Sequence, residues 1–181
     1  MHKFIALLRG INVSGQKKII MSELKTMIEK LGFENVLTYI QSGNVIFEHT
    51  SNHPEQFKNT LRIALEEKYG FSVYIDVLRV GEIRKIYIDL PFDNIDLNAD
   101  GSKVIVCFLS DKPEAESLSL LKEFLTPREE LISLDKVLYL HCPEGSGKSK
   151  VSNAVIERKL NVSSTARNLK TVAKLCELSK D

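Results

Sequence analysis

The sequence lacks the cysteine patterns that stabilise small secreted domains or hold zinc. Its 181 residues include three cysteines, which stand far apart without a CxxC pair: Cys107, Cys142 and Cys176. An odd number of distant cysteines predicts neither a disulfide framework nor a zinc site. The four histidines also lack the spacing of metal ligands: His2, His49, His53 and His141. We therefore expect no metal and, given free thiols, a cytoplasmic location.

The sequence also lacks an excess of one charge and a long apolar run. Lysine and arginine number 25 against 24 aspartates and glutamates, which argues against a dedicated partner among nucleic acids or anionic membranes. The apolar run Phe4–Leu8 is too short for the core of a signal peptide. No segment approaches the roughly 20 apolar residues that cross a bilayer. With 43% hydrophobic and 27% charged residues, the composition is that of a globular chain.

What the first half does contain is an alternation of short β-rich runs and amphipathic helices. The patterns predict an apolar strand over 3–9, a helix over 22–31 and a hairpin over 36–48 that turns at Ser42-Gly43. A second helix over 54–69 and an alternating strand over 71–77 follow. This βαββαβ order is that of the ferredoxin-like, or split-βαβ, unit. A connecting helix over 80–90 follows, and the polar segment 91–102 is typical of a module boundary.

The same order restarts at residue 103. We expect a strand over 103–109, a helix over 113–125 and a hairpin over 131–141 that turns at Asp135-Lys136. Two further helices are expected over 151–160 and 165–178, with no final strand. The prediction is an α+β fold of duplicated ferredoxin-like modules with extra helices. The first module covers residues 1–90, and the second, of βαββα type with C-terminal helices, covers 91–181. Because strands 3–9 and 103–109 are apolar on both sides, both faces of each sheet should be covered.

One sheet edge collects polar side chains. In a split-βαβ unit the loop after the first strand and the strand-two/three hairpin meet at the same edge. This brings together seven residues: Arg9, Asn12, Lys17, Lys18, Gln41, Ser42 and Asn44. Such donors beside a helix N-terminus suit a phosphate or carboxylate. The same residues are also typical of ordinary turns and solvated loops, and the pattern leaves both interpretations open.

The run Gly145–Ser149 resembles the end of a phosphate-binding P-loop. The full motif needs a glycine where this chain has Cys142. The sequence therefore argues against a nucleoside triphosphatase and leaves only weak anion binding at Lys148 open. RNA recognition would need stacking aromatics, and the candidates, Phe4 and Phe47, are predicted to be core. No triad, carboxylate pair or HExxH motif identifies a catalytic site.

Longer stretches of the sequence resemble a known family. They are IALLRGINVSGQKKI, MSELKTMIEKLGFENVLTYIQSGNVIF, LYLHCPEGSGKSK, NAVIERKL and STARNLKTVAKL, and they are similar to the bacterial proteins grouped as domain of unknown function 1697. The resemblance covers nearly the whole chain and implies a duplicated ferredoxin-like α+β fold, without an established activity. It nominates Arg9, Gly10, Asn12, Gly15, Gln41, Ser42, Gly43, Asn44, Lys148, Ser149, Thr165, Arg167 and Asn168. Leu169 stands where many relatives are expected to carry tryptophan, which argues against aromatic stacking there.

Three functions follow from these patterns. The first, which we predict, is a binding module for a small anionic ligand: phosphate, a nucleotide or a carboxylate. The second is an enzyme whose phosphorylated or carboxylated substrate is oriented by Arg9 and Arg167. The third is an interaction scaffold whose polar motifs only fix loops. The candidate ligand-binding residues are the seven at the sheet edge with Lys148, Arg167 and Asn168, and no cofactor is predicted.

Overall fold

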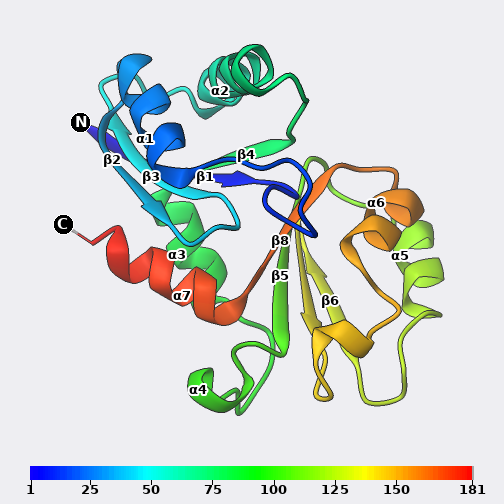
Figure 1. The fold of residues 1–181 in the computed structure, drawn as a ribbon. Helices are drawn as coiled ribbons and strands as arrows, with labels where there is room; N and C mark the ends of the chain where they lie inside the picture. Colours follow the sequence, from blue (N-terminus) through cyan, green and yellow to red (C-terminus); the bar gives the residue numbers. More distant parts are fainter. Residues whose placement is uncertain (181) are drawn as a thin grey trace. The chain divides into compact units, whose positions relative to one another are not determined.

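The computed structural model describes residues 1–180 of the chain. Within this range the chain forms two four-stranded antiparallel sheets with helices packed against them, which confirms a mixed α+β fold (Figure 1). Contacts divide it into unit 1, Met1–Arg84 with the residues from Leu175 onward, and unit 2, Lys85–Lys174. The predicted modules, 1–90 and 91–181, stay a prediction.

Unit 1 contains the first sheet and the helices around it. Its elements are β1 (His2–Leu8), α1 (Met21–Lys30), β2 (Glu34–Tyr39), β3 (Asn44–His49), α2 (Pro54–Tyr69), β4 (Ile75–Arg79) and the start of α3 (Val80–Ile88). The strands lie in the order β2-β3-β1-β4. Helix α2 begins at Pro54 and ends before Gly70, whose φ of 73° and N–H bond to the Glu66 carbonyl cap the helix. Glycine is favoured there because the backbone is left-handed.

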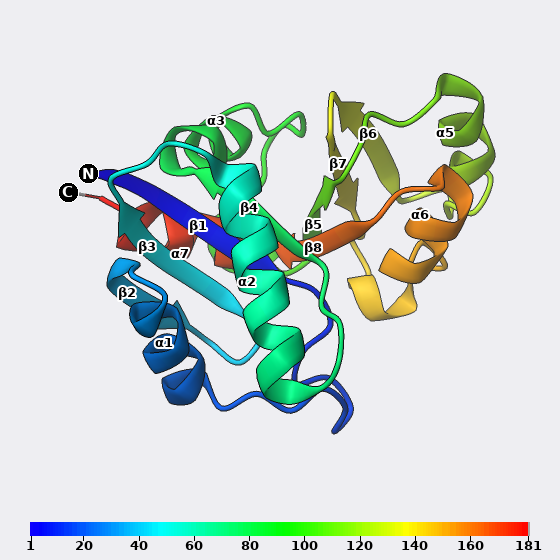
Figure 2. The ribbon, with the colours of Figure 1, turned by 90° about the horizontal axis from the view of Figure 1, so that it is seen from above.

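Both faces of the unit 1 sheet are covered, as the apolar pattern of β1 predicts. Phe4, Ala6 and Leu8 point into a core shared with α1 and α2, where Phe4 stacks on Phe47 with ring centroids 5.6 Å apart. The alternate residues of β1, Ile5 and Leu7, are fully buried as well. Within unit 1, the start of α3 (residues 80–84) and the part of α7 (Leu169–Leu178) from Leu175 onward lie on this second face, opposite α1 and α2 (Figures 1 and 2). The burial of side chains on both faces explains why β1 is a continuous apolar run.

The fourth strand begins later than predicted. The alternating pattern indicates a strand over 71–77, whereas β4 spans Ile75–Arg79. Its partner β1 ends at Leu8, which pairs with Ile75. Residues before Ile75 therefore have no strand to pair with, although Val73 is still buried in the core.

Unit 2 contains the second sheet. Its elements are α4 (Leu97–Asp100), β5 (Val104–Leu109), α5 (Ala115–Lys122), β6 (Glu130–Leu134), β7 (Val137–His141), a 3₁₀ turn (Ser146–Lys148), α6 (Asn153–Leu160), β8 (Ser164–Asn168) and the start of α7. The strand order is β6-β7-β5-β8. One face packs on α5 and α6 through Leu121, Ile156 and Leu160. On the other face Tyr139 donates its hydroxyl to the Ile86 carbonyl at 2.9 Å.

The prediction of a helix from Thr165 and of no final strand is wrong. Residues Ser164–Asn168 form β8, which pairs with β5 from Leu109↔Ser164 to Ile105↔Asn168. The second half is therefore βαββαβ rather than βαββα. Of the five residues of β8, only Thr165 is of a type enriched in strands, and here the edge of β5 decides the conformation. The helix starts only after Asn168, whose Oδ1 accepts from the Thr171 N–H at 2.9 Å.

Two backbone hydrogen bonds recur at corresponding places in the two units. In unit 1 the Leu8 N–H donates to the Gly43 carbonyl at 2.8 Å, and the Arg9 N–H donates to the Tyr74 carbonyl at 2.9 Å. In unit 2 the Leu109 N–H donates to the Lys136 carbonyl at 2.9 Å, and the Ser110 N–H donates to the Ser163 carbonyl at 2.8 Å. The ends of β1 and β5 therefore occupy equivalent places in their sheets, and Arg9 corresponds to Ser110.

Candidate functional site

The loop after β1 has an unusual backbone. Five of its residues have positive φ: Gly10, Asn12, Ser14, Gly15 and Lys17. Its tip closes as a tight turn, with the Gln16 N–H bonded to the Val13 carbonyl at 2.9 Å and the Asn12 N–H to the Lys17 carbonyl at 3.2 Å. Positive φ values are one half of the alternating backbone pattern that forms anion-binding nests.

Asn12 holds this loop against the hairpin. Its Nδ2 donates to the carbonyl oxygens of Ile19 and Gln41, both at 2.9 Å. Its Oδ1 accepts from the Ile19 N–H at 2.8 Å. One amide side chain thus joins both ends of the loop to the turn between β2 and β3, and the prediction that these two segments meet is confirmed.

The turn itself is shaped by Gly43 and Asn44. Gly43 has a φ of 81°, and a β-carbon there would meet Leu8 Cβ at 2.7 Å and Ile11 Cδ1 at 2.8 Å. Asn44 is fully buried and donates Nδ2 to the Tyr39 carbonyl and Ser42 Oγ, both at 3.0 Å. Gln41 is exposed. Ser42 and Asn44, predicted as ligand contacts, therefore form hydrogen bonds that stabilise the turn.

A third segment, residues 70–74, completes this edge, and the sequence prediction missed it. Besides the Arg9–Tyr74 backbone bond, the Lys17 ammonium donates to the Ser72 carbonyl at 2.7 Å and lies 5.9 Å from the Phe71 ring centroid. The βαββαβ order could have indicated it, because the start of strand four must lie beside the end of strand one. We call the surface formed by residues 9–20, 40–44 and 70–74 the basic edge.

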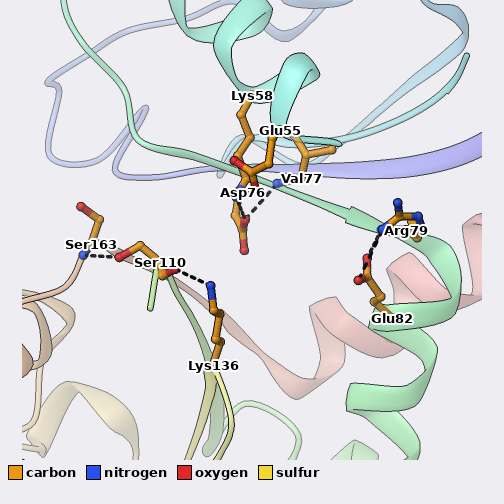
Figure 3. Close-up of polar contacts among 9 residues, drawn as sticks. All are labelled: Glu55, Lys58, Asp76, Val77, Arg79, Glu82, Ser110, Lys136 and Ser163. Atoms are coloured by element: carbon orange, nitrogen blue, oxygen red, sulfur yellow. Dashed lines mark hydrogen bonds and ion pairs between the residues drawn. The ribbon is translucent and has the colours of Figure 1, made fainter. Parts of the chain in front are cut away.

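The three segments of the basic edge contain cationic residues and no acidic residue. Arg9, Lys17 and Lys18 are the charged residues of its three segments. Arg9 is half-buried, while Lys18 is exposed. The nearest carboxylates along the chain are engaged elsewhere: Glu23 lies 3.6 Å from the Lys68 ammonium, and Asp76 lies 2.9 Å from that of Lys58 (Figure 3). This arrangement can attract an anion.

The Asp76 carboxylate is neutralised in an ion-pair cluster with Lys58 and Glu55. Burial acts to lower the pKa of the Lys58 ammonium, but hydrogen bonds and charge from Glu55 and Asp76 outweigh it and raise that pKa well above its usual range. Asp76 also accepts from the Val77 N–H at 3.1 Å. The Asp76 carboxylate is therefore satisfied within unit 1, beside α2.

The three predicted residues of unit 2 lie in two elements, Lys148 in the 3₁₀ turn and Arg167 and Asn168 in β8, and they differ in exposure. Lys148 is exposed in the 3₁₀ turn, and α6 begins only at Asn153, after its own cap Ser152. A P-loop helix would start directly at the lysine. Arg167 is 7% exposed and donates to Thr165 Oγ1 at 2.9 Å and the Ala166 carbonyl at 2.8 Å. Burial lowers its pKa to about 10, so the guanidinium stays charged at neutral pH.

Arg9 belongs to unit 1 and Arg167 to unit 2, so their joint action on one ligand stays a prediction. Within residues 1–180 no group of three or more histidines, cysteines, aspartates or glutamates could hold a metal ion. In the same range, no helix has the length and apolar character needed to cross a membrane. The three cysteines are free and buried.

Comparisons with known proteins give a family match and a solved structure of similar fold. A family model described as "Protein of unknown function (DUF1697)" matches residues 1–139. The solved structure of the conserved bacterial protein SP0830 from Streptococcus pneumoniae is similar over 99% of both chains, with a TM-score of 0.74 and 23% sequence identity. A search of curated proteins gives no match. At this identity the solved structure supports the fold alone.

Proposed function

The chain belongs to the DUF1697 family of proteins of unknown function, and we propose that it is a binding module for a small anionic ligand: phosphate, a nucleotide or a carboxylate. The ligand would bind at the basic edge of unit 1. The observation that carries this proposal is that one loop brings Arg9, Lys17 and Lys18 to an edge whose three segments, residues 9–20, 40–44 and 70–74, contain no acidic residue. An anion would bind to these cations.

The residues of the basic edge would have two roles, fixing the backbone and contacting the ligand. The hydrogen bonds of Asn12, Ser42 and Asn44 hold the backbone in place before a ligand arrives, which lowers the entropy lost on binding. The three cations would then contact the ligand. Each charge-assisted hydrogen bond of this kind contributes roughly 1.5–3 kcal/mol. Lys17 is already oriented by the Ser72 carbonyl, a neutral acceptor that leaves its charge in place.

Thermal shift assays with phosphate, sulfate and nucleotides test this proposal. We expect these anions to stabilise the wild-type protein and to stabilise Arg9→Ala and Lys18→Gln less. Lys30→Gln is the matched control, because Lys30 is an exposed lysine of unit 1 at the end of α1, outside the basic edge. If no anion stabilises the wild type, or if Lys18→Gln and Lys30→Gln respond alike, the basic edge is not an anion site.

A second candidate function, an interaction scaffold, is favoured by one observation. Asn12 and Asn44 direct their donors to groups of the protein itself. Under this alternative the polar residues only fix the loop and turn, and a protein partner would contact the exposed residues around them. The same titration separates the two functions, because a scaffold without a ligand shows no anion response.

Lys148, Arg167 and Asn168 are proposed as a second set of anion contacts, in unit 2. The exposure of Lys148 supports a weak contact there. Arg167 is buried and would have to act by its charge rather than by direct contact. Lys148→Gln measured in the same assay tests this part separately.

We further propose that the two units are ferredoxin-like modules related by duplication, in a cytoplasmic protein. The duplication is supported by the identical relative strand order of the two sheets and by the recurring hydrogen bonds after β1 and β5. The location is supported by three free, buried thiols.

A further inference from the structure

A cavity lies at the opposite end of the unit 1 sheet from the basic edge. It has a volume of about 310 Å³ and is lined by Lys3, Asn52, Arg79, Val80, Gly81 and Arg84, among others. These residues come from the start of β1, the segment after β3, the end of β4 and the start of α3. Because β1 has seven residues, the cavity and the basic edge are roughly 20 Å apart.

Arg79 is held in a fixed orientation at this cavity. Its Nε donates to Asn52 Oδ1 at 2.9 Å and its Nη2 to the Asn52 carbonyl at 3.2 Å. Glu82 accepts from the Arg79 N–H at 2.6 Å and lies 3.7 Å from Nη1 (Figure 3). A guanidinium fixed mainly by neutral oxygens needs little reorganisation to bind a planar or tetrahedral anion.

Two further cations line the cavity. The Arg84 guanidinium donates to the Ser179 carbonyl at 3.0 Å, a neutral acceptor. The Lys3 ammonium lies 3.6 Å from Glu48 and donates to the Lys180 carbonyl at 3.4 Å. The lining itself contains no aspartate or glutamate among the described residues. Glu48 and Glu82 pair with Lys3 and Arg79, so two of the three cations already face a carboxylate.

From this cavity and its cations we infer a binding site for the phosphate group of a small phosphorylated molecule. Two guanidiniums and an ammonium match the several acceptor oxygens of a phosphate ester. The volume is at the small end of ligand pockets, roughly 300–1,000 Å³. Gly81 adds room, since a β-carbon there would meet nothing within 4 Å. This site shares no residue with the basic edge.

Amide chemical shifts of the ¹⁵N-labelled full chain test the inference. The probes are inorganic phosphate, ribose 5-phosphate and, as the uncharged control, ribose. We expect both phosphates to shift the Val80 and Gly81 signals and ribose to leave them unchanged. Arg84→Gln should weaken binding about tenfold. The signals of Gln16–Lys18 report the basic edge in the same spectra, so either site can fail without the other.

A pair of substitutions at Gly81 keeps the test independent of folding. Gly81→Asp places a carboxylate in the lining near the start of α3, where it favours the helix, and should abolish the shifts. Gly81→Ala fits the open space and should bind phosphate as the wild type does. The inference is overturned if neither phosphate shifts Val80 and Gly81, or if Gly81→Asp binds like Gly81→Ala. A response to inorganic phosphate without one to ribose 5-phosphate would also overturn it.

Discussion

Replacing Gly43 by alanine should be among the most destabilising single-methyl changes in unit 1. The residue has a φ of 81°, and its carbonyl accepts the N–H of Leu8 at 2.8 Å. A side chain in the left-handed region costs roughly 1–2 kcal/mol. The new β-carbon would also lie 2.7 Å from Leu8 Cβ and 2.8 Å from Ile11 Cδ1, both fully buried, and overpacking of this kind costs roughly 1–3 kcal/mol.

The expected loss is therefore about 2–5 kcal/mol in the free energy of unfolding. Gly15→Ala is the matched control, because Gly15 has a φ of 76° but a β-carbon there meets nothing within 4 Å. It should lose only the backbone contribution, about 1–2 kcal/mol. Urea denaturation followed by circular dichroism measures both variants.

Hydrogen exchange of the Leu8 amide adds a local measurement. In Gly43→Ala its protection should fall, because the carbonyl that accepts this N–H has to move. Equal destabilisation by the two alanine variants, within about 0.5 kcal/mol, would refute the steric argument.

Two further predictions follow. Asn12→Asp keeps the acceptor for the Ile19 N–H but loses both donors, so it should destabilise the protein by about 1–3 kcal/mol in urea denaturation. Gln41→Ala is the control and should be nearly neutral, because it keeps the Gln41 carbonyl. Equal losses of stability in the two variants would contradict the role of Asn12 in holding the loop against the turn. Burial raises the pKa of Cys107 to about 12 and of Cys142 to about 11. The protonated thiols therefore stabilise the fold fully below the unfolded-state pKa of roughly 8.5, and this contribution is lost as the pH rises toward 11. Thiol reagents should react slowly with the native protein, and Cys142→Ala should flatten the alkaline fall in stability; a pH profile identical to wild type would contradict this.

Elements that are specified by neighbouring residues in the sequence lie close to where the sequence predicts them. Helix α2 spans Pro54–Tyr69 as its proline start and glycine stop indicate, and the turn at Ser42-Gly43 joins β2 to β3. The continuous apolar run of β1 predicts burial on both faces, and Ile5 and Phe4 are both fully buried. Periodicity and capping act within a few residues, so the sequence carries them directly.

Elements that depend on a distant partner are the ones that differ. Whether Ser164–Asn168 is helix or strand is decided by the free edge of β5. Where β4 begins is decided by the end of β1 at Leu8. Neither partner is visible within a short window of sequence, because strand pairing joins residues far apart in the chain.

The candidate sites divide in the same way. The amino-acid sequence by itself determined that Arg9, Lys17 and Lys18 stand in a loop without acids, and its strand order indicated that this loop meets the 40–44 turn. Only the tertiary structure decided that Asn12 and Asn44 satisfy the protein's own carbonyls, that residues 70–74 join the basic edge, and that Arg79 and Arg84 line a cavity. Charge is a property of each residue, but which charges converge depends on how the strands pair and where each strand ends.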